Sequence, residues 1–454
     1  MQRAASPQTK ANPSSRLLAK PCLNPMRQLR NLCWLSTLFI LVGCHPPNHL
    51  MPTPALYSHG AQPAFSNNLP TELKRPEMPI LYVTDRKPTN KTPQNWSYGI
   101  GRDRSFAVGE AIVGFQKNTS WEELATDATK STRKAPYKMR IRSVDEKVRT
   151  PNYPLKYLNR HQHSSAAPAV KSEEAEAIAD TKRLIQQRLK LSPKKELLIY
   201  VHGFATDFEK SLCTTAGLWH FMGREMVPIT YTWPAGSGSL LRGYAYDRES
   251  SELTVFHFKR LLKWISDMPE VEGVHLIAHS RGADVTINTL RELALESLAR
   301  GQNPQSRYKI RNVVLAAPDV SGEIGLEKLT DSGANRISRR WLTYTSGRDK
   351  AIGIAEYLFS SSRWGRIRWD RLSADDLEAI EFYSGFFGKE DATVEYRGRL
   401  GGSFGHEFHI ANTIVSSDLV LALRFNKSPG PEHGRPLHQK GSLFWIIDEN
   451  FYNQ

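Results

Sequence analysis

One stretch of the chain, residues 273–290, restricts the possible folds more than any other. Val274–Ala278 is a short apolar run, rich in β-branched residues, and is typical of a fully buried strand. From Asp284 onward apolar residues recur at helical spacing, which predicts an amphipathic helix as far as Leu295. The turn between the strand and the helix carries Ser280 at its tip. The stretch therefore predicts a strand, a tight turn and a helix, with a serine presented at the end of the strand.

A serine on such a turn is a candidate nucleophile. The nucleophile elbow, in its commonest form G-x-S-x-G, presents its serine between a buried strand and a helix. The strand and the helix nearly touch two residues before and two residues after the serine, where Ala278 and Gly282 stand. Alanine thus replaces the first glycine of the pattern. Serine between small residues is also common in ordinary loops, so the prediction depends on the flanking strand and helix.

The rest of the chain alternates apolar runs with amphipathic segments. The expected strands are residues 79–84, 107–115, 139–143, 196–201, 229–233, 274–278, 312–319, 341–346 and, as the last strand, 393–397. The expected helices are residues 173–190, 251–268, 284–295 and 412–423. This order predicts an α/β fold, with a mostly parallel central sheet and helices on both of its faces.

The apolar strand at residues 196–201 is followed by His202-Gly203-Phe204. Gly203 lets the backbone approach a neighbour closely and turn an N–H outward. A developing oxyanion can be stabilised by one backbone N–H from the loop after this strand and by the N–H of the residue that follows the nucleophile. The candidate donors are therefore the N–H groups of Phe204 and Arg281. The alternative is a simple turn that ends the strand. His202 is expected to brace this loop.

A serine hydroxyl needs a histidine base, and the base needs a carboxylate to orient it. Where the serine stands on such an elbow, the acid follows the serine along the chain and the histidine comes after the acid. Asp349, after the strand at 341–346, is the first choice for the acid, and Asp319 is the alternative, which could instead cap the following segment. His406 is the first choice for the base and His409 the alternative. His275 and His279 are expected to be packing residues.

These features resemble the α/β-hydrolase superfamily, and most closely a bacterial family catalogued as domain of unknown function 900. The motifs that match are Tyr82–Arg86, His202–Phe204, Thr232–Pro234, Tyr246-Asp247, Ala278–Gly282, Ala316–Asp319, Ser346 with Asp349, and Gly405-His406. The resemblance runs from roughly residue 80 to residue 425 and implies serine-hydrolase chemistry without a cofactor or an assigned substrate. Members of the family more often carry methionine where Arg281 stands, so this cation is expected to alter the mouth of the pocket.

The N-terminal region predicts export and lipid attachment. Met26–Arg30 is basic, and Leu32–Val42 is apolar but too short to span a bilayer stably. The run Leu41–Cys44 resembles the lipobox of bacterial lipoproteins, which implies cleavage before Cys44 and a diacylglycerol on its thiol. His45 after the cysteine implies the outer membrane of the cell envelope. The alternatives are a signal anchor or an accidental apolar run.

The overall charge and the cysteines exclude several other functions. The 61 Lys and Arg residues exceed the 46 Asp and Glu residues, but they are scattered and no nucleic-acid motif accompanies them. Of the four cysteines only Cys44 and Cys213 follow the predicted cleavage, so no intramolecular disulfide is expected. No cysteine or histidine group has metal-ligand spacing, and we expect neither a metal nor a cofactor.

The expected organisation has four parts. Residues 1–43 are a leader and signal peptide, residues 44–75 a proline-rich extended tether, residues 76–425 the hydrolase domain, and residues 426–454 an extension packed on that domain. The polar stretch at residues 116–170 is expected to be irregular. An insertion at about residues 352–388 combines aromatic and basic side chains, which suits either a lid over a lipid or amphipathic ester or a helical cap that stabilises the fold.

The predicted function is that of a serine hydrolase, most simply a carboxylic-ester hydrolase that acts through Ser280, His406, Asp349 and an acyl-enzyme. The choice of an ester over an amide rests on analogy with the superfamily. Two alternatives stay open: a catalytically silent scaffold tethered to the membrane, and an acyltransferase of the same fold, because the hydration of the pocket selects the acceptor. The expected partners are a small-molecule or lipid ester and the membrane.

Overall fold

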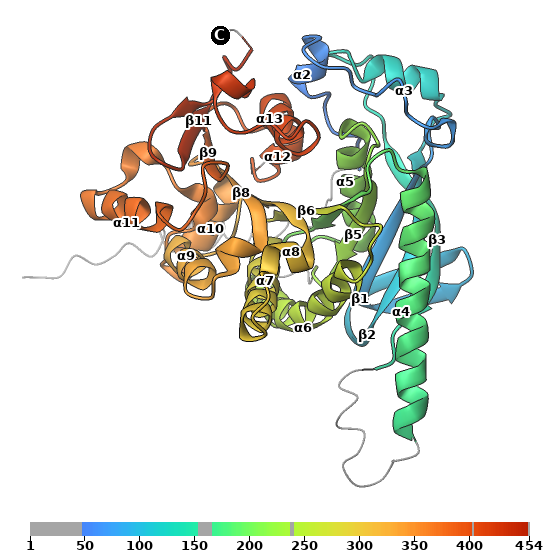
Figure 1. Cartoon of the computed structure of the whole chain (residues 1–454). Helices are drawn as coiled ribbons and strands as arrows, with labels where there is room; N and C mark the ends of the chain where they lie inside the picture. The colour runs from blue at the N-terminus through green and yellow to red at the C-terminus, as the bar shows by residue number, and fades with distance from the viewer. Residues whose placement is uncertain (1–47, 153–165, 237–239, 402–403, 453–454) are drawn as a thin grey trace, which may run out of the picture. The chain divides into compact units, whose positions relative to one another are not determined.

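The structure, a computed structural model, describes residues 48–152, 166–236, 240–401 and 404–452. The predicted signal peptide and the predicted lipidation site Cys44 lie outside the described residues. One eleven-stranded sheet organises the described chain, in the order β10-β11-β9-β8-β7-β6-β4-β5-β1-β2-β3 (Figure 1). Its strands are β1 Met78–Thr92, β2 Asn95–Phe115, β3 Met139–Arg149, β4 Glu196–Val201, β5 Val227–Thr232, β6 Gly273–His279, β7 Ile310–Ala316, β8 Ser338–Thr345, β9 Ala392–Tyr396, β10 His438–Gln439 and β11 Phe444–Ile447.

The middle of the sheet is parallel. Every pairing from β1 through β5, β4, β6, β7, β8 and β9 to β11 is parallel, whereas β2, β3 and β10 pair antiparallel at the two edges. All residues of β4, β5 and β6 are buried, as expected of strands covered on both faces. The predicted α/β fold with a mostly parallel sheet is therefore confirmed.

Helices cover both faces of the sheet (Figure 1). The longer ones are α4 Ala166–Leu191, α5 Phe208–Phe221, α6 Leu240–Ser266, α7 Gly282–Ala299, α10 Lys350–Phe359, α11 Ala374–Ser384 and α13 Thr413–Leu423. The shorter ones are α2 Ala55–Ser58, α3 Trp121–Asp127, α8 Pro304–Tyr308, α9 Gly322–Thr330 and α12 Phe408–Ala411, and single 3₁₀ turns η2 Thr71–Leu73, η4 Ala334–Ile337, η5 Trp364–Arg366, η6 Trp369–Arg371 and η7 Pro431–His433 join them.

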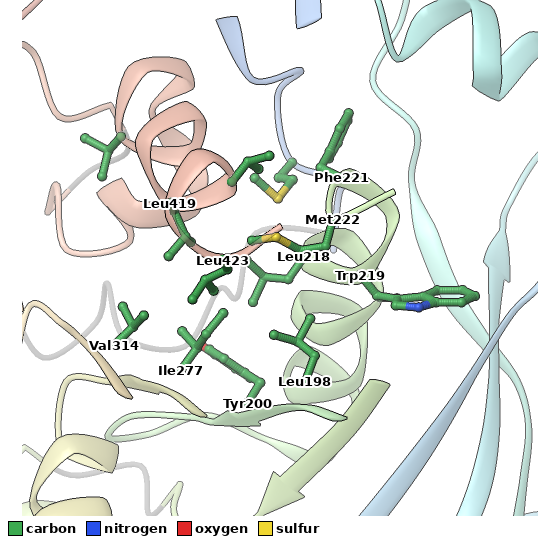
Figure 2. Packing of buried hydrophobic residues seen from close by; sticks show 14 of the residues in the cluster. Leu198, Tyr200, Leu218, Trp219, Phe221, Met222, Ile277, Val314, Leu419 and Leu423 are labelled. Atoms are coloured by element: carbon green, nitrogen blue, oxygen red, sulfur yellow. The ribbon is translucent and has the colours of Figure 1, made fainter. Parts of the chain in front are cut away.

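Two hydrophobic cores result, one on each face. On one face α4, α6 and α7 bury their apolar sides against the strands, with Ile185, Leu261 and Leu290 among the buried residues. On the other face α5 and α13 meet over the middle of the sheet. Figure 2 shows this second core, in which Leu419 and Leu423 of α13 lie near Leu218 of α5 and Ile277 of β6.

The order of the strands reverses between β4 and β6. From β4 the chain crosses to β5 on one side, and it then returns to place β6 on the other side of β4. The connections that leave the carboxyl ends of β4 and β6 therefore run in opposite directions, which opens a crevice at that edge. Open α/β sheets bind their ligands at such a switch point. Gly203 follows β4 and Ser280 follows β6, so both lie at this crevice.

The expected extended tether at residues 44–75 is wrong for the part that is described. Leu50, Leu56, Tyr57 and Leu73 are buried in the core beside α5 and α13. The Tyr57 hydroxyl donates a 2.6 Å hydrogen bond to the carbonyl of Phe221. The prolines favour extended backbone, but the apolar side chains between them gain more free energy by burial than the segment loses by being ordered.

Two further expectations about the chain are corrected. The expected strand at residues 139–143 is confirmed as part of β3, which pairs with β2, but the rest of the stretch at residues 116–170 is not irregular where it is described, because it contains α3 and the start of α4. The strand at residues 393–397 is not the last of the sheet, because β11 pairs with β9 in parallel and β10 then pairs with β11. A short apolar strand near a chain end has no helix after it and is hard to recognise from the sequence.

A buried ion pair links α13 to the segment after it. The side chains of Arg435 and Asp418 are both fully buried, with Nε–Oδ1 and Nη2–Oδ2 distances of 2.7 and 2.8 Å. Replacing Arg435 with leucine leaves the carboxylate of Asp418 with only the Tyr344 hydroxyl as a side-chain partner. We expect the free energy of unfolding in urea to fall by about 3–5 kcal/mol.

The double variant Arg435→Leu, Asp418→Leu is the matched control for this effect. It removes both charges, so it is expected to unfold at a higher urea concentration than Arg435→Leu alone. A single variant that loses less than about 1 kcal/mol would contradict the expectation, because it would show that the carboxylate finds water or another partner.

Candidate active site

Ser280 occupies a strained turn at the end of β6. Its φ angle is +54°, in the left-handed region that residues with a Cβ atom rarely adopt. The turn is held from both sides, because the Ser280 N–H donates to the carbonyl of Ala316 at 2.9 Å and the Ser280 carbonyl accepts from the Asp319 N–H at 3.2 Å. This backbone geometry is that of a nucleophile elbow. The residue is only 4 % exposed.

Small residues permit the contacts around this turn. A Cβ atom on Gly282 would lie 2.5 Å from the carbonyl oxygen of His202 and 2.6 Å from that of Val201. A Cβ atom on Gly203 would lie 2.6 Å from the Cβ of Ser280. Both glycines are therefore required where the loop after β4 meets the elbow. Ala278, which replaces the first glycine of the common motif, is fully buried.

The two expected oxyanion donors lie at this meeting point. Phe204 belongs to the loop after β4, and Arg281 is the residue before α7. Within the described chain neither of their backbone N–H groups donates a hydrogen bond to another protein group. Both N–H groups are therefore available to a ligand atom near Ser280.

Buried polar side chains brace the loop that carries Phe204. The guanidinium of Arg86 donates to the carbonyls of Thr206 at 2.6 Å and of Ala235 at 2.9 Å, and it lies 3.3 Å from Nε2 of His202. The carboxylate of Asp247 accepts from the Ala205 N–H at 3.1 Å. Burial raises the pKa of Asp247 to about 6. The loop is thus held rigidly, with His202 in the bracing position expected from the sequence.

The structure brings the expected acid and base together. Nδ1 of His406 lies 2.7 Å from Oδ2 of Asp349. The other carboxylate oxygen of Asp349 accepts from the Ile352 N–H at 3.0 Å and caps α10. The carbonyl of His406 lies 3.1 Å from Nε2 of His279, the residue before Ser280. The pair therefore lies beside the elbow.

No hydrogen bond joins the Ser280 hydroxyl to His406, although both residues are described. Contacts of this kind are often long in free enzymes and shorten when a substrate binds. Burial disfavours the charged form of His406, but the charge and the hydrogen bond of Asp349 outweigh burial and raise the pKa of His406 above its ordinary value. The nearby carboxylate thus makes this imidazole a stronger base.

The alternative acid and base have other surroundings. Asp319 accepts a 2.6 Å hydrogen bond from the Tyr244 hydroxyl, and one of its carboxylate oxygens lies 3.5 Å from Nε of Arg363. His409 is fully buried against the ring of His279, and neither of its ring nitrogens has a hydrogen-bond partner. Burial lowers the pKa of His409 to about 3. Neither alternative makes an acid–base contact of the kind that joins Asp349 to His406.

Comparison with known families agrees with this geometry. Residues 177–381 match the family model described as an alpha/beta hydrolase of unknown function, DUF900. This match and the mostly parallel sheet together show that the chain has an α/β-hydrolase fold. The matched region contains Ser280 and Asp349 and ends before His406. A search of the curated proteins found no match to the chain.

The insertion of this α/β-hydrolase, at residues 352–388, has a packed part and an exposed part. The N–H groups of Trp364 and Gly365 donate to the carbonyls of Val320 and Pro318, at 2.8 and 2.9 Å, which ties the middle of the insertion to the loop after β7. By contrast α11 has no buried residue, and its Phe382 is 65 % exposed. The middle of the insertion is therefore fixed to the rest of the domain, whereas α11 presents apolar side chains to its surroundings.

Sequence reasoning missed several residues of the candidate site. Arg86 and Asp247 stand in the matching motifs, but no local pattern indicates that they contact the loop of Phe204. Tyr244 and Arg363 contact Asp319 although they are distant from it in sequence, and no local signal indicates this.

The described residues include neither a metal-binding cluster nor a membrane-spanning helix. No group of three or more His, Cys, Asp or Glu residues among them is placed to hold a metal ion. None of the helices formed by these residues is both long enough and apolar enough to cross a membrane. Cys213, the cysteine within the described range, is buried and unpaired.

Proposed function

We propose that this α/β-hydrolase is a serine hydrolase that cleaves carboxylic esters through an acyl-enzyme on Ser280. One observation carries the proposal: the strained turn of Ser280 lies at the switch point of the sheet, beside a histidine that is hydrogen-bonded to a buried carboxylate. A serine, a histidine and an acid in this chain order and at this edge of the sheet are the components of nucleophilic acyl transfer.

Each step of the proposed reaction uses a group described above. The Ser280 oxygen attacks the ester carbonyl while Nε2 of His406 takes the hydroxyl proton, and Asp349 holds the resulting imidazolium through Nδ1. The N–H groups of Phe204 and Arg281 stabilise the oxyanion, and one such donor contributes about 3 kcal/mol. His406 then returns the proton to the leaving alcohol as the ester bond breaks. Water attacks the acyl-enzyme by the same route and releases the acid.

A covalent probe tests the identity of the nucleophile. The purified chain is expected to react with a fluorophosphonate, and peptide mass spectrometry is expected to find the adduct on Ser280. Ser280→Ala should lose the label. Ser321→Ala is the matched control, because Ser321 is also a buried serine near the end of a parallel strand, and it should keep the label.

The reaction products separate the remaining candidate functions. Release of acid from 4-nitrophenyl esters in water alone supports the hydrolase. Acyl transfer that requires an added alcohol or amine would instead identify an acyltransferase of the same fold. A folded wild-type chain that neither takes the label nor turns over esters, with or without detergent, would contradict the proposal and indicate a silent scaffold.

A further inference from the structure

A cleft of about 560 Å³ lies next to the elbow. Arg281, the residue after Ser280, lines this cleft together with Tyr244 and Arg363. We call it the arginine cleft and define it by six of its lining residues: Tyr244 and Arg248 of α6, Arg281, Arg291 of α7, Lys328 of α9, and Arg363.

The lining of the arginine cleft is positively charged. Its five cations face three acids, Glu252, Asp284 and Glu292, which leaves a surplus of two positive charges. Among the described residues Arg248 and Arg291 form no ion pair. A concave surface lined by one sign of charge concentrates the field and attracts ligands of the opposite sign.

The neighbouring charges leave this surplus unchanged. Asp284 is shared between Arg281, at 2.9 Å, and Lys328, at 3.5 Å, so one carboxylate serves two cations. Two further charged residues lie behind the lining: Asp319 near Arg363, and Lys259 bound to Glu292. Their charges are opposite and cancel. The positive net charge of the cleft therefore favours the binding of a negatively charged group.

Two of the arginines are buried without complete pairing. Arg281 is 8 % exposed and Arg363 is 9 % exposed, and Nε of each has no hydrogen-bond acceptor. Nε of Arg363 lies 3.5 Å from Oδ1 of Asp319, which is too long for a good hydrogen bond. A buried donor on a cation is costly to leave unpaired. An oxyanion ligand would satisfy such donors, and arginine binds carboxylate and phosphate groups particularly well.

The arginine cleft is connected to the nucleophile through shared residues. The Tyr244 hydroxyl binds Asp319, whose own N–H binds the carbonyl of Ser280. The ring of Tyr244 packs on those of Phe204, with centroids 5.6 Å apart, and Phe359, with centroids 4.5 Å apart. These aromatic rings form a wall that leads from the oxyanion loop to the cleft. One arm of an ester held at Ser280 can thus follow this wall towards the arginines.

We propose that the arginine cleft binds an anionic group, a carboxylate or a phosphate, that the ester substrate carries. The proposal rests on the proposed function of Ser280 and names its substrate class: esters with a negatively charged arm, in preference to neutral esters of the same size. Arg281 and Arg363 are the specificity-determining residues, and Arg248, Arg291 and Lys328 add attraction at the mouth.

A matched pair of substrates tests the preference. Mono-4-nitrophenyl glutarate carries a carboxylate on its acyl arm, and its methyl ester is the neutral counterpart. The wild-type chain is expected to favour the anionic ester in kcat/KM by roughly tenfold to a hundredfold. Arg281→Met and Arg363→Met should bring the ratio towards one, chiefly by raising KM for the anionic ester. Arg339→Met, at an exposed pair with Glu390, should keep the ratio.

Anion binding without turnover separates this proposal from the proposed function. Calorimetric titration of Ser280→Ala with glutarate and with inorganic phosphate should show binding that the additional Arg363→Met change weakens at least tenfold. Such binding in a chain whose wild type cleaves no ester would support the cleft and overturn the proposed function. Equal kcat/KM values for the two esters, together with no anion binding, would overturn the cleft proposal and leave the nucleophile intact.

The source of the anion is decided by competition. If inorganic phosphate and phosphatidylglycerol vesicles both inhibit the anionic ester reaction in the wild type and not in Arg363→Met, a small free anion is sufficient for the cleft. If only the vesicles inhibit, with phosphatidylcholine vesicles as the neutral control, the anionic group belongs to a lipid headgroup. Inhibition that Arg363→Met leaves unchanged would place the anion elsewhere and contradict the proposal.

Discussion

Ser280→Ala and His406→Ala are each expected to lower kcat for a 4-nitrophenyl ester by roughly 10⁶-fold. The first variant has no nucleophile, and the second cannot take the hydroxyl proton, so either change removes the same covalent step. The double variant should lose no more activity than either single variant, because the groups act as a unit. Steady-state kinetics on all three, with circular dichroism to verify the fold, measure this.

Two outcomes would contradict this expectation. A loss of less than about a hundredfold in Ser280→Ala would show that the acyl group does not pass through this serine. Losses that multiply in the double variant would show that Ser280 and His406 act in separate steps. His409→Ala, which removes the alternative base, is the control and should leave far more activity than His406→Ala.

Asp349→Asn is expected to lower kcat by roughly 10⁴-fold. Asparagine can still cap α10 through the Ile352 N–H, so the local fold is kept. However, the amide no longer fixes the tautomer of His406 or stabilises its charged form. Kinetics over a pH range should show both effects, because the acid limb of the rate profile reports the protonation of His406.

The direction of the pH shift follows from the native pKa of His406. Asp349 raises the pKa of His406 above 6.5, so wild-type activity should fall as the pH drops through this raised pKa. Asp349→Asn should move the acid limb of the rate profile to lower pH. The interaction of charged His406 with Asp349 stabilises the fold fully below about pH 6.5, and this stabilisation is lost as the pH rises through the pKa of His406 in the folded state. The variant should therefore lose more stability at pH 5 than at pH 9.

Asp319→Asn is the matched control for Asp349. Its side chain contacts Tyr244 and Arg363, and its charge contributes less than that of Asp349 to the raised pKa of His406, so the limb of the pH profile should move less than in Asp349→Asn. A shift as large as that of Asp349→Asn would show that the alternative acid orients the base.

The core of the fold could be predicted because its signals are local. The elbow at Ser280, the apolar strand before His202 and the acid after β8 each combine a buried strand with a distinctive turn. Parallel strands place their carboxyl ends at one edge, so the order of these turns along the chain also predicts where they meet.

The features that the sequence did not indicate depend on distant contacts. The composition of residues 48–75 is that of a tether, and only the folded chain shows that Leu56 and Tyr57 are buried against α5 and α13. The strand β11 is short and lies near the end of the chain, and only its pairing with β9 defines it. Arg363 lies within the insertion at residues 352–388, whose path no periodicity predicts, and only the fold brings it to Asp319. The arginine cleft therefore becomes visible only in the folded chain.

The contact between the first and last parts of the described chain determines when folding can finish. The Leu56 N–H donates to the hydroxyl of Ser417, and the guanidinium of Arg424 binds the carbonyls of Pro63 and Ala64. These bonds join residues about 360 positions apart. During synthesis the early segment must wait for α13 before it can be buried, so an interrupted chain exposes the apolar surface that would otherwise close the fold.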